Sequence, residues 1–165
     1  MATYGGQNVG AGKWERLHQG IRACVLLAAV YSAGSLGALW LFGDGLNMLF
    51  LDGESAHLLP LARQCLLTNA AFYLLLSLVN IFRFMIQGMG FSPLATLAGV
   101  LEMIARAGVA CLVPALGFPA ACFASPAAWL MADVFLVPAY FWCCRRLSAP
   151  ERVKAPKQKA VHAAS

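Results

Sequence analysis

Charged residues are scarce in this sequence. Asp, Glu, Lys and Arg make up 12% of its 165 residues, whereas apolar residues make up 61%. A soluble domain usually has about 25% charged and about 45–50% apolar residues, so an ordinary soluble globule is excluded. Disordered chains are poor in apolar residues, so disorder is excluded as well. Six cysteines are too few for a disulfide-rich scaffold. The remaining class is an integral membrane protein.

Stretches with almost no charge recur four times along the chain, over residues 23–42, 58–82, 93–113 and 118–142. Each is long enough to cross a hydrocarbon core of about 30 Å, which takes about 20 residues as a helix. None alternates with the period of two that a barrel strand needs, and each is longer than such a strand. We therefore expect an all-α polytopic membrane protein with four transmembrane helices.

Basic residues are unevenly sorted among the connections. The connection between the first two stretches contains Asp44, Asp52 and Glu54 but no Lys or Arg. The basic residues outside the four stretches all belong to the opposite set of connections or to the chain ends: Lys13, Arg16, Arg22, Arg83, Arg145, Arg146, Arg152, Lys154, Lys157 and Lys159. Four crossings place both termini on one side, which the positive-inside rule assigns to the cytoplasm. Topology in the plasma (inner) membrane thus explains the net charge of +5, and no nucleic-acid partner is expected.

The two ends of the chain are expected to be less regular than its middle. Residues 1–22 contain a glycine cluster typical of a loop, followed by a short amphipathic helix. The Gly-Lys pair in this cluster is not a phosphate-binding loop, because Gln7 and Trp14 stand where that motif needs Gly and Ser or Thr. Residues 145–165 are basic, rich in Ala and Pro, and expected to form a disordered cytoplasmic tail. No bound cofactor or metal site is expected.

Three ionisable residues inside the expected helices are candidates for function. Charges at membrane depth are unfavourable and usually face a bundle interior or a wet cavity. Glu102 and Arg106 are four residues apart, which places both on one helix face as an ion pair. That pair either fixes how its helix packs or takes part in gating and ion coupling. Asp133 has no basic residue within reach on its own helix, so it either meets Arg106 or another residue across the bundle, or it titrates. No nucleophile and base can be paired, so an enzyme is not expected.

Polar residues also follow one face of the second stretch. Asn69, Tyr73, Ser77 and Asn80 recur at spacings of three and four, so they share a helix face. A polar face on an otherwise apolar membrane helix is directed toward protein or water. Asn69, Tyr73 and Asn80 are therefore candidate cavity-lining residues.

Three motifs resemble those of the multidrug and toxic compound extrusion (MATE) transporters. Residues 7–13, QNVGAGK, resemble one cytoplasmic loop of that family, and residues 82–102, FRFMIQGMGFSPLATLAGVLE, resemble a later cytoplasmic loop and the helix after it. SPAAWLMAD, at residues 125–133, resembles the family's last helix. The resemblance covers residues 2–147 and assigns seven residues to the cytoplasmic loops: Gln7, Asn8, Gly10, Gly12, Arg83, Gln87 and Gly88.

The resemblance implies the last four helices of a twelve-helix, two-lobe antiporter that exports cationic or amphipathic drugs and toxins against a sodium or proton gradient. No residue here matches the acidic sites of the first lobe, and residues 58–82 lack a carboxylate that some members carry there. We therefore expect a fragment or one piece of a split protein, inactive alone. Its expected partners are the lipid bilayer, the missing helices or a split partner chain, and the exported compounds. The alternative is a small multi-pass membrane protein that acts by helix-mediated binding of partners or lipids.

Overall fold

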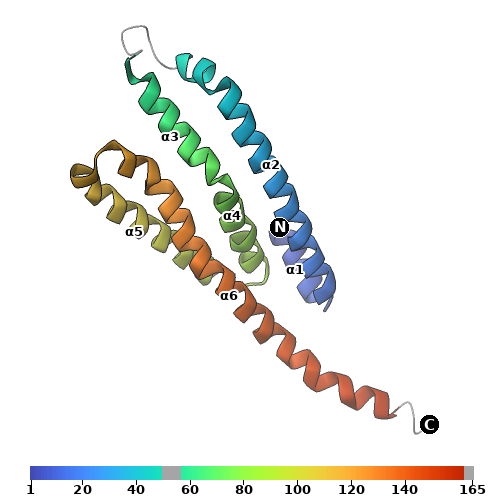
Figure 1. Cartoon of the computed structure of the whole chain (residues 1–165). Coiled ribbons are helices and arrows are strands. Elements are labelled where there is room, and N and C mark those ends of the chain that lie inside the picture. Colours follow the sequence, from blue (N-terminus) through green and yellow to red (C-terminus); the bar gives the residue numbers. More distant parts are fainter. Residues whose placement is uncertain (50–56, 162–165) are drawn as a thin grey trace.

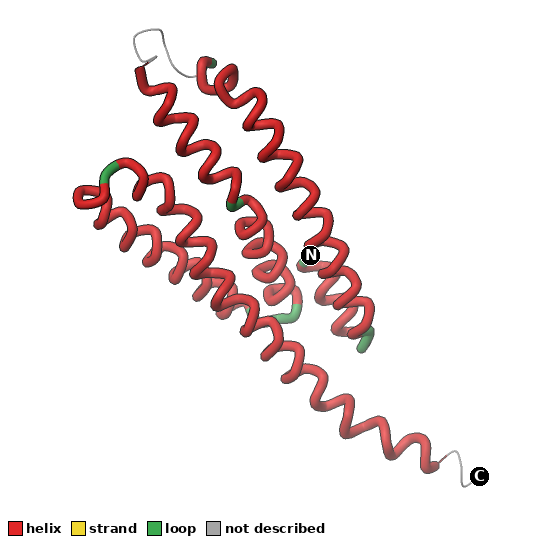
Figure 2. Tube along the Cα trace, viewed as in Figure 1, coloured by secondary structure: helices red, strands yellow, loops and turns green. Residues whose placement is uncertain are grey.

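The computed structural model of the chain describes residues 1–49 and 57–161. Its helices are α1 (Ala2–Gly10), α2 (Trp14–Met48), α3 (Leu59–Ala71), α4 (Tyr73–Gly88), α5 (Ser92–Leu116) and α6 (Phe118–Val161), as labelled in Figure 1. Across the described residues the regular structure is helical, and short turns join the helices (Figure 2). The expected all-α class is confirmed for this part of the chain.

Three helices are long and apolar enough to cross a membrane by themselves, namely α2, α5 and the Phe118–Ser148 part of α6. Helices α3 and α4 reach that length and hydropathy only as a pair, which is bent by 45°. The chain therefore has three candidate spans, or four if the bent pair is counted as one span. The four expected stretches all coincide with these helices.

The second stretch is not the single helix expected over residues 58–82, and that expectation is wrong at Phe72. The Phe72 amide donates to the carbonyl of Asn69, three residues back, at 3.1 Å, and the Leu75 amide donates to the Phe72 carbonyl at 3.0 Å. These bonds form a tight turn between α3 and α4. The Asn69 side chain also donates to the carbonyl of Cys65 at 2.8 Å, a local bond of the kind that bends helices. The break therefore arises at polar side chains without Pro or Gly.

Both ends of the chain are more helical than expected. The glycine cluster forms α1, and α2 starts at Trp14. Helix α1 packs against α4 and α2, and such tertiary contacts outweigh the poor helix propensity of glycine. At the other end, α6 continues to Val161 where a disordered tail was expected. Most residues of this extension are Ala, Arg, Lys, Glu, Gln or Leu, which favour helix.

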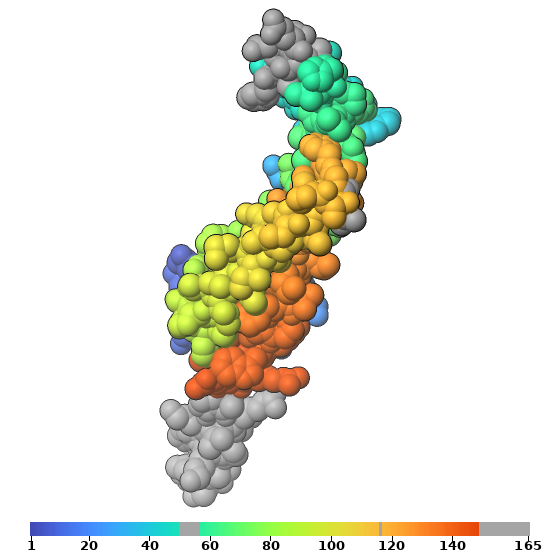
Figure 3. All heavy atoms as spheres, turned by 90° about the vertical axis from the view of Figure 1, so that its left-hand side faces the viewer, coloured from blue at the N-terminus to red at the C-terminus, as the bar shows by residue number. Residues whose placement is uncertain are grey.

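The helices form two groups around a shared centre. Helix α2 packs against α1, α3 and α4, while α6 packs against α3, α4 and α5. Helices α3 and α4 therefore lie between α2 and α6 (Figure 1). On the face drawn in Figure 3, α5 and α6 lie side by side. The start of α2, the end of α4 and the start of α5 lie at the same end of the bundle, from which the last part of α6 extends further (Figure 1). The basic residues close to these helix ends in the sequence therefore belong to this end of the bundle.

A single non-helical residue reverses the chain between the last two candidate spans. Gly117 alone separates α5 from α6, and it has φ 77° and ψ −168°. Residues other than glycine rarely adopt this backbone conformation, so glycine is required at the turn. The result is a close antiparallel pair, α5 and α6, that carries the groove described below.

The interior is concentrated in α4 and in residues 129–144 of α6. The buried cluster contains Leu17, Ile21, Val79, Phe82, Met85, Ile86, Met89, Ala98, Trp129, Ala132, Leu136, Tyr140, Cys143 and Cys144. By contrast, α2 and α5 leave most of their apolar side chains exposed, including Leu27, Val30, Trp40, Phe42, Met103 and Ile104. Such extensive apolar surface would promote aggregation in water, whereas lipid tails are as apolar as these side chains. The exposed faces therefore suit a bilayer.

Candidate functional site

Asp133 is the most unusual polar residue in the described part of the chain. It lies at the middle of the apolar Phe118–Ser148 stretch of α6, and its side chain is 6% exposed. Neither carboxylate oxygen has a hydrogen-bond partner among the described residues. Its neighbours on the same buried face of α6, Ala132 and Leu136, are fully buried and apolar. A carboxylate in such surroundings is unfavourable unless it is neutralised or paired.

Arg106 does not reach Asp133, which was one of the expected arrangements. Its guanidinium donates to Glu102 at 3.1 Å, so the ion pair forms as the four-residue spacing indicates. The opposite oxygen of Glu102 accepts a hydrogen bond from Arg83 on α4 at 2.8 Å. One carboxylate thus bridges two guanidinium groups, and two neighbouring helices, α4 and α5, are joined by charge.

Arg83 is the member of this network that was not expected to pair with Glu102. It was expected in a cytoplasmic loop, but it belongs to α4. Its side chain is 24% exposed and that of Glu102 is 18% exposed, whereas Arg106 is 49% exposed. The Arg83–Glu102 pair is therefore the better shielded of the two. The two partners are nineteen positions apart in the sequence, and this spacing gives no periodic signal, because the pair depends on how two helices dock.

The polar stripe is divided by the break between α3 and α4. Asn69 belongs to α3, whereas Tyr73, Ser77 and Asn80 belong to α4. The side chains of Ser77 and Asn80 donate to carbonyls four residues earlier on their own helix, at 3.0 Å and 2.9 Å. All four residues are partly buried. Their role as cavity lining stays a prediction.

The residues expected in cytoplasmic loops are mostly helical, which corrects that expectation. Gln7, Asn8 and Gly10 lie in α1, and Gln87 and Gly88 end α4; only Gly12 occupies a turn. These segments pack together because glycine permits close approach. A Cβ at Gly88 would lie 2.1 Å from the backbone oxygen of Ala2, and one at Gly20 would lie 2.3 Å from the Tyr4 ring. The glycines therefore serve helix docking between α1, α2 and α4.

Two further contacts tie distant helices together and were not foreseen. The Tyr140 hydroxyl lies 3.1 Å from Nδ1 of His18, which links α6 to the start of α2. At the opposite end of the molecule, Arg63 of α3 donates to Asp44 of α2 at 2.5 Å. Asp44 was expected in a connection, but it lies within α2. The acidic residues Asp52 and Glu54, expected in the same connection, lie outside the described residues.

Of three comparisons with known proteins, one gives a match. A family model described as MatE matches residues 1–112, which run from α1 through most of α5. Comparisons with curated proteins and with solved structures give no match. The family indicated by the motifs in α1 and at the end of α4 is thereby confirmed. Helix α6, with Asp133, lies outside the matched residues.

Proposed function

Because the chain belongs to the MatE family, which is a family of multidrug and toxin efflux transporters, we propose that it provides the C-terminal helices of an exporter of cationic or amphipathic compounds. The observation that carries this proposal is the family match over residues 1–112. The transport is antiport, driven by a sodium or proton gradient through alternating access. The chain acts in the plasma membrane with both termini in the cytoplasm.

The broken span supports a transport role. In transporters, substrates and coupling ions bind near the bilayer midplane at helices whose backbone is interrupted. The 45° break between α3 and α4 is such an interruption, and it lies next to Asn69 and Tyr73. Phe72, at the break, makes an edge contact with Phe123 of α6, with ring centres 6.1 Å apart. We assign the polar lining of the transport path to Asn69, Tyr73 and Asn80 on this basis.

Asp133 supports the coupling part of the proposal. Intramembrane carboxylates mark ion pathways and proton relays, because only a functional requirement offsets their unfavourable burial. Asp133 is buried at the middle of the apolar Phe118–Ser148 stretch without a partner in the described chain, whereas Glu102 is satisfied by Arg83 and Arg106. We assign exchange of the coupling ion to Asp133 and a stabilising role to the Glu102 network.

A second lobe is needed to form a central cleft. The described helices pack around a single buried cluster, whereas alternating access requires two units that rock against each other. We therefore propose that further transporter helices, or a split partner chain, complete the exporter, and that this chain alone transports little.

Complementation of a drug-sensitive bacterial strain tests the proposal. The chain is expressed alone and joined to the preceding eight helices of a MatE-family transporter, and drug resistance and ethidium efflux are measured. We expect rescue only by the joined protein. Rescue by neither form, with both proteins present in the membrane, would contradict the exporter assignment and favour the small multi-pass binding protein.

The joined protein also tests Asp133. We expect Asp133→Asn to abolish ion-driven efflux, because the amide cannot exchange a proton or hold a cation as the carboxylate does. Glu102→Gln is the matched control, since it removes a carboxylate from another candidate span, and it is expected to lower protein stability while leaving coupling intact. Unchanged efflux by the Asp133→Asn protein would remove Asp133 from the mechanism without affecting the family assignment.

A further inference from the structure

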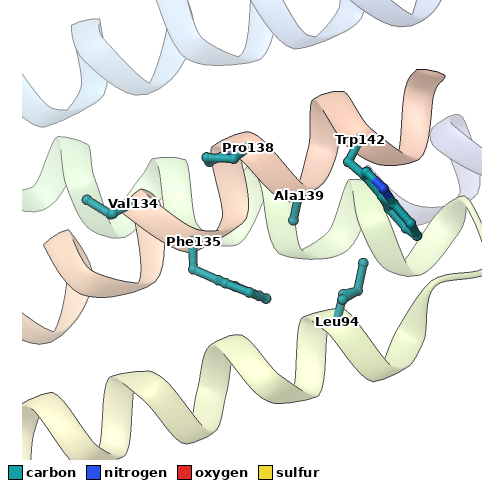
Figure 4. A pocket seen from close by; sticks show the side chains of 6 residues that line it. All are labelled: Leu94, Val134, Phe135, Pro138, Ala139 and Trp142. Carbon is teal, nitrogen blue, oxygen red and sulfur yellow. The ribbon is translucent and has the colours of Figure 1, made fainter. Parts of the chain in front are cut away.

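An apolar groove lies between α5 and α6. It is an open hollow with a volume of about 360 Å³, lined by Leu94, Val134, Phe135, Pro138, Ala139 and Trp142. In Figure 4, Phe135 and Trp142 point from α6 toward α5, Ala139 lies between them, and Leu94 rises from α5. The small side chain of Ala139 leaves the space that its larger neighbours enclose.

The groove faces the surroundings of the protein. Val134 and Trp142, at its two ends, are 64% and 48% exposed. The groove lies within the apolar Phe118–Ser148 stretch and extends over residues 134–142, about 12 Å along the helix axis. Its outer side therefore opens toward lipid tails, and its shape suits a linear hydrocarbon chain.

One end of the groove carries positive charge. The Arg146 guanidinium lies over the Trp142 ring, 5.0 Å from its centre, and Arg145 beside it is exposed. Neither arginine forms an ion pair with a carboxylate in the described part of the chain. The Trp142 ring also makes an edge contact with Phe91, with ring centres 5.7 Å apart, so the ring is held at the groove mouth.

From this combination we propose that the α5–α6 groove is a binding site for one anionic phospholipid. One acyl chain lies in the groove along Phe135 and Ala139, and the phosphate group contacts Arg146 and Arg145. Tryptophan and arginine at the end of a span lie at headgroup level, where basic groups bind anionic lipid headgroups. The charge at the mouth distinguishes this lipid from a zwitterionic one.

Quenching of tryptophan fluorescence by brominated lipids tests the proposal. The full chain is placed in nanodiscs of phosphatidylcholine with increasing brominated phosphatidylglycerol, or with brominated phosphatidylcholine as the neutral counterpart. The signal of Trp142 is the difference between the natural protein and its Trp142→Phe variant. We expect Trp142 to be quenched at a several-fold lower fraction of brominated phosphatidylglycerol, since each basic group near the surface contributes about fivefold to anionic lipid binding.

Two variants separate the headgroup from the acyl chain. Arg145→Gln/Arg146→Gln is expected to abolish the preference for phosphatidylglycerol. Ala139→Leu fills the groove and is expected to reduce quenching by both lipids. The matched control is Arg16→Gln/Arg22→Gln, which removes equal charge from α2, where both side chains are exposed at the same end of the molecule, and is expected to keep the preference.

Three results would overturn the proposal. Equal quenching by the two lipids would mean that the groove does not select charge. An equal loss of preference in the α2 control would indicate general surface attraction without a site. An absence of quenching by either lipid would mean that protein covers the groove, either another transporter helix or a second copy of this chain. Circular dichroism verifies that each variant remains helical.

Discussion

The two ends of the bundle are packed very differently although both are apolar. At the end where α1, the last half of α4 and the last half of the α6 span meet, the side chains of Met85, Ile86 and Tyr140 are almost fully buried. At the opposite end, near the α2–α3 connection, Met48 and Leu49 are 63% and 78% exposed. We call these the tight end and the loose end.

Hydrophobicity alone therefore does not determine where the helices of this protein pack closely. In a bilayer, apolar side chains gain little by leaving lipid for protein, so close contact and shape decide where helices associate. The tight end has what close contact needs, namely small residues such as Gly5 and Gly88 and interlocking aromatic rings such as Phe82 and Tyr140. The loose end is joined by the ion pair Arg63–Asp44. Four sets of substitutions test whether the two ends are held as differently as they are packed.

The largest expected effect is a cavity at the tight end. Leu136→Ala removes a fully buried side chain, and such substitutions destabilise proteins by about 2–5 kcal/mol. Leu130→Ala is the matched control on the same helix, because Leu130 is 53% exposed, and its effect should stay within about 0.5 kcal/mol. Unfolding in mixed detergent micelles, followed by circular dichroism, measures both. Equal losses would mean that α6 is not packed as described.

The second effect is a clash between α1 and α4. Gly88→Ala places a methyl group against the backbone of Ala2, and overpacking of this kind typically destabilises by about 1–3 kcal/mol. At Gly108 of α5 there is nothing within 4 Å of an added Cβ. Gly108→Ala should therefore stabilise the helix by about 0.5–1 kcal/mol. The same unfolding measurement gives the two signs, and a stabilising Gly88→Ala would show that α1 does not dock on α4.

The third effect concerns the two arginines that share Glu102. Arg83→Gln removes the shielded link between α4 and α5, and we expect a loss of about 1.5–3 kcal/mol, as for hydrogen bonds to charged groups. Arg106→Gln removes a half-exposed pair within one helix, which is typically worth about 0.3–0.5 kcal/mol. If Arg106→Gln were the more damaging change, the pairing of Glu102 across the two helices would be wrong.

The smallest effect is expected at the loose end. Asp44→Asn and Arg63→Gln each remove one partner of an ion pair whose side chains are 46% and 42% exposed. A double-mutant cycle should give a coupling energy below about 1 kcal/mol that falls further at high salt. A salt-insensitive coupling as large as that of Arg83 would mean that the loose end is as firmly held as the tight end.

Much of the fold was predictable because membrane helices need length and apolar composition, and both are local properties. Residues 23–42 and 93–113 were placed inside α2 and α5 from their length and their apolar composition, although the second stretch contains Glu102 and Arg106. The Glu102–Arg106 pair was equally predictable, because four residues make one helical turn. The break at Phe72 was not predictable, because no Pro or Gly marks it and the bond from the Asn69 side chain to the Cys65 carbonyl also occurs within continuous helices.

The candidate site shows the same division. Asp133 was identified from the sequence as a lone carboxylate in an apolar stretch, but its burial and its lack of a partner depend on the faces that α6 turns inward. Arg83 and Gly88 were expected in loops, and their roles in helix docking were not predicted. Their contacts are with Glu102 and Ala2, which belong to other helices. A residue's own neighbourhood in sequence carries no record of such contacts.

Amino-acid composition and short-range patterns are enough to show that this chain belongs in a bilayer, which stretches become helical, and which family its loops and helix ends resemble. These properties follow from composition and from patterns within one helical turn. The close packing of the helices at the tight end and the docking of α1 on α4 depend on the tertiary structure. The groove between α5 and α6, with two arginines at its mouth, depends on it as well. The physical reason is that lipid satisfies apolar surface almost as well as protein does, so helix association depends on shape and on a few polar contacts between distant residues.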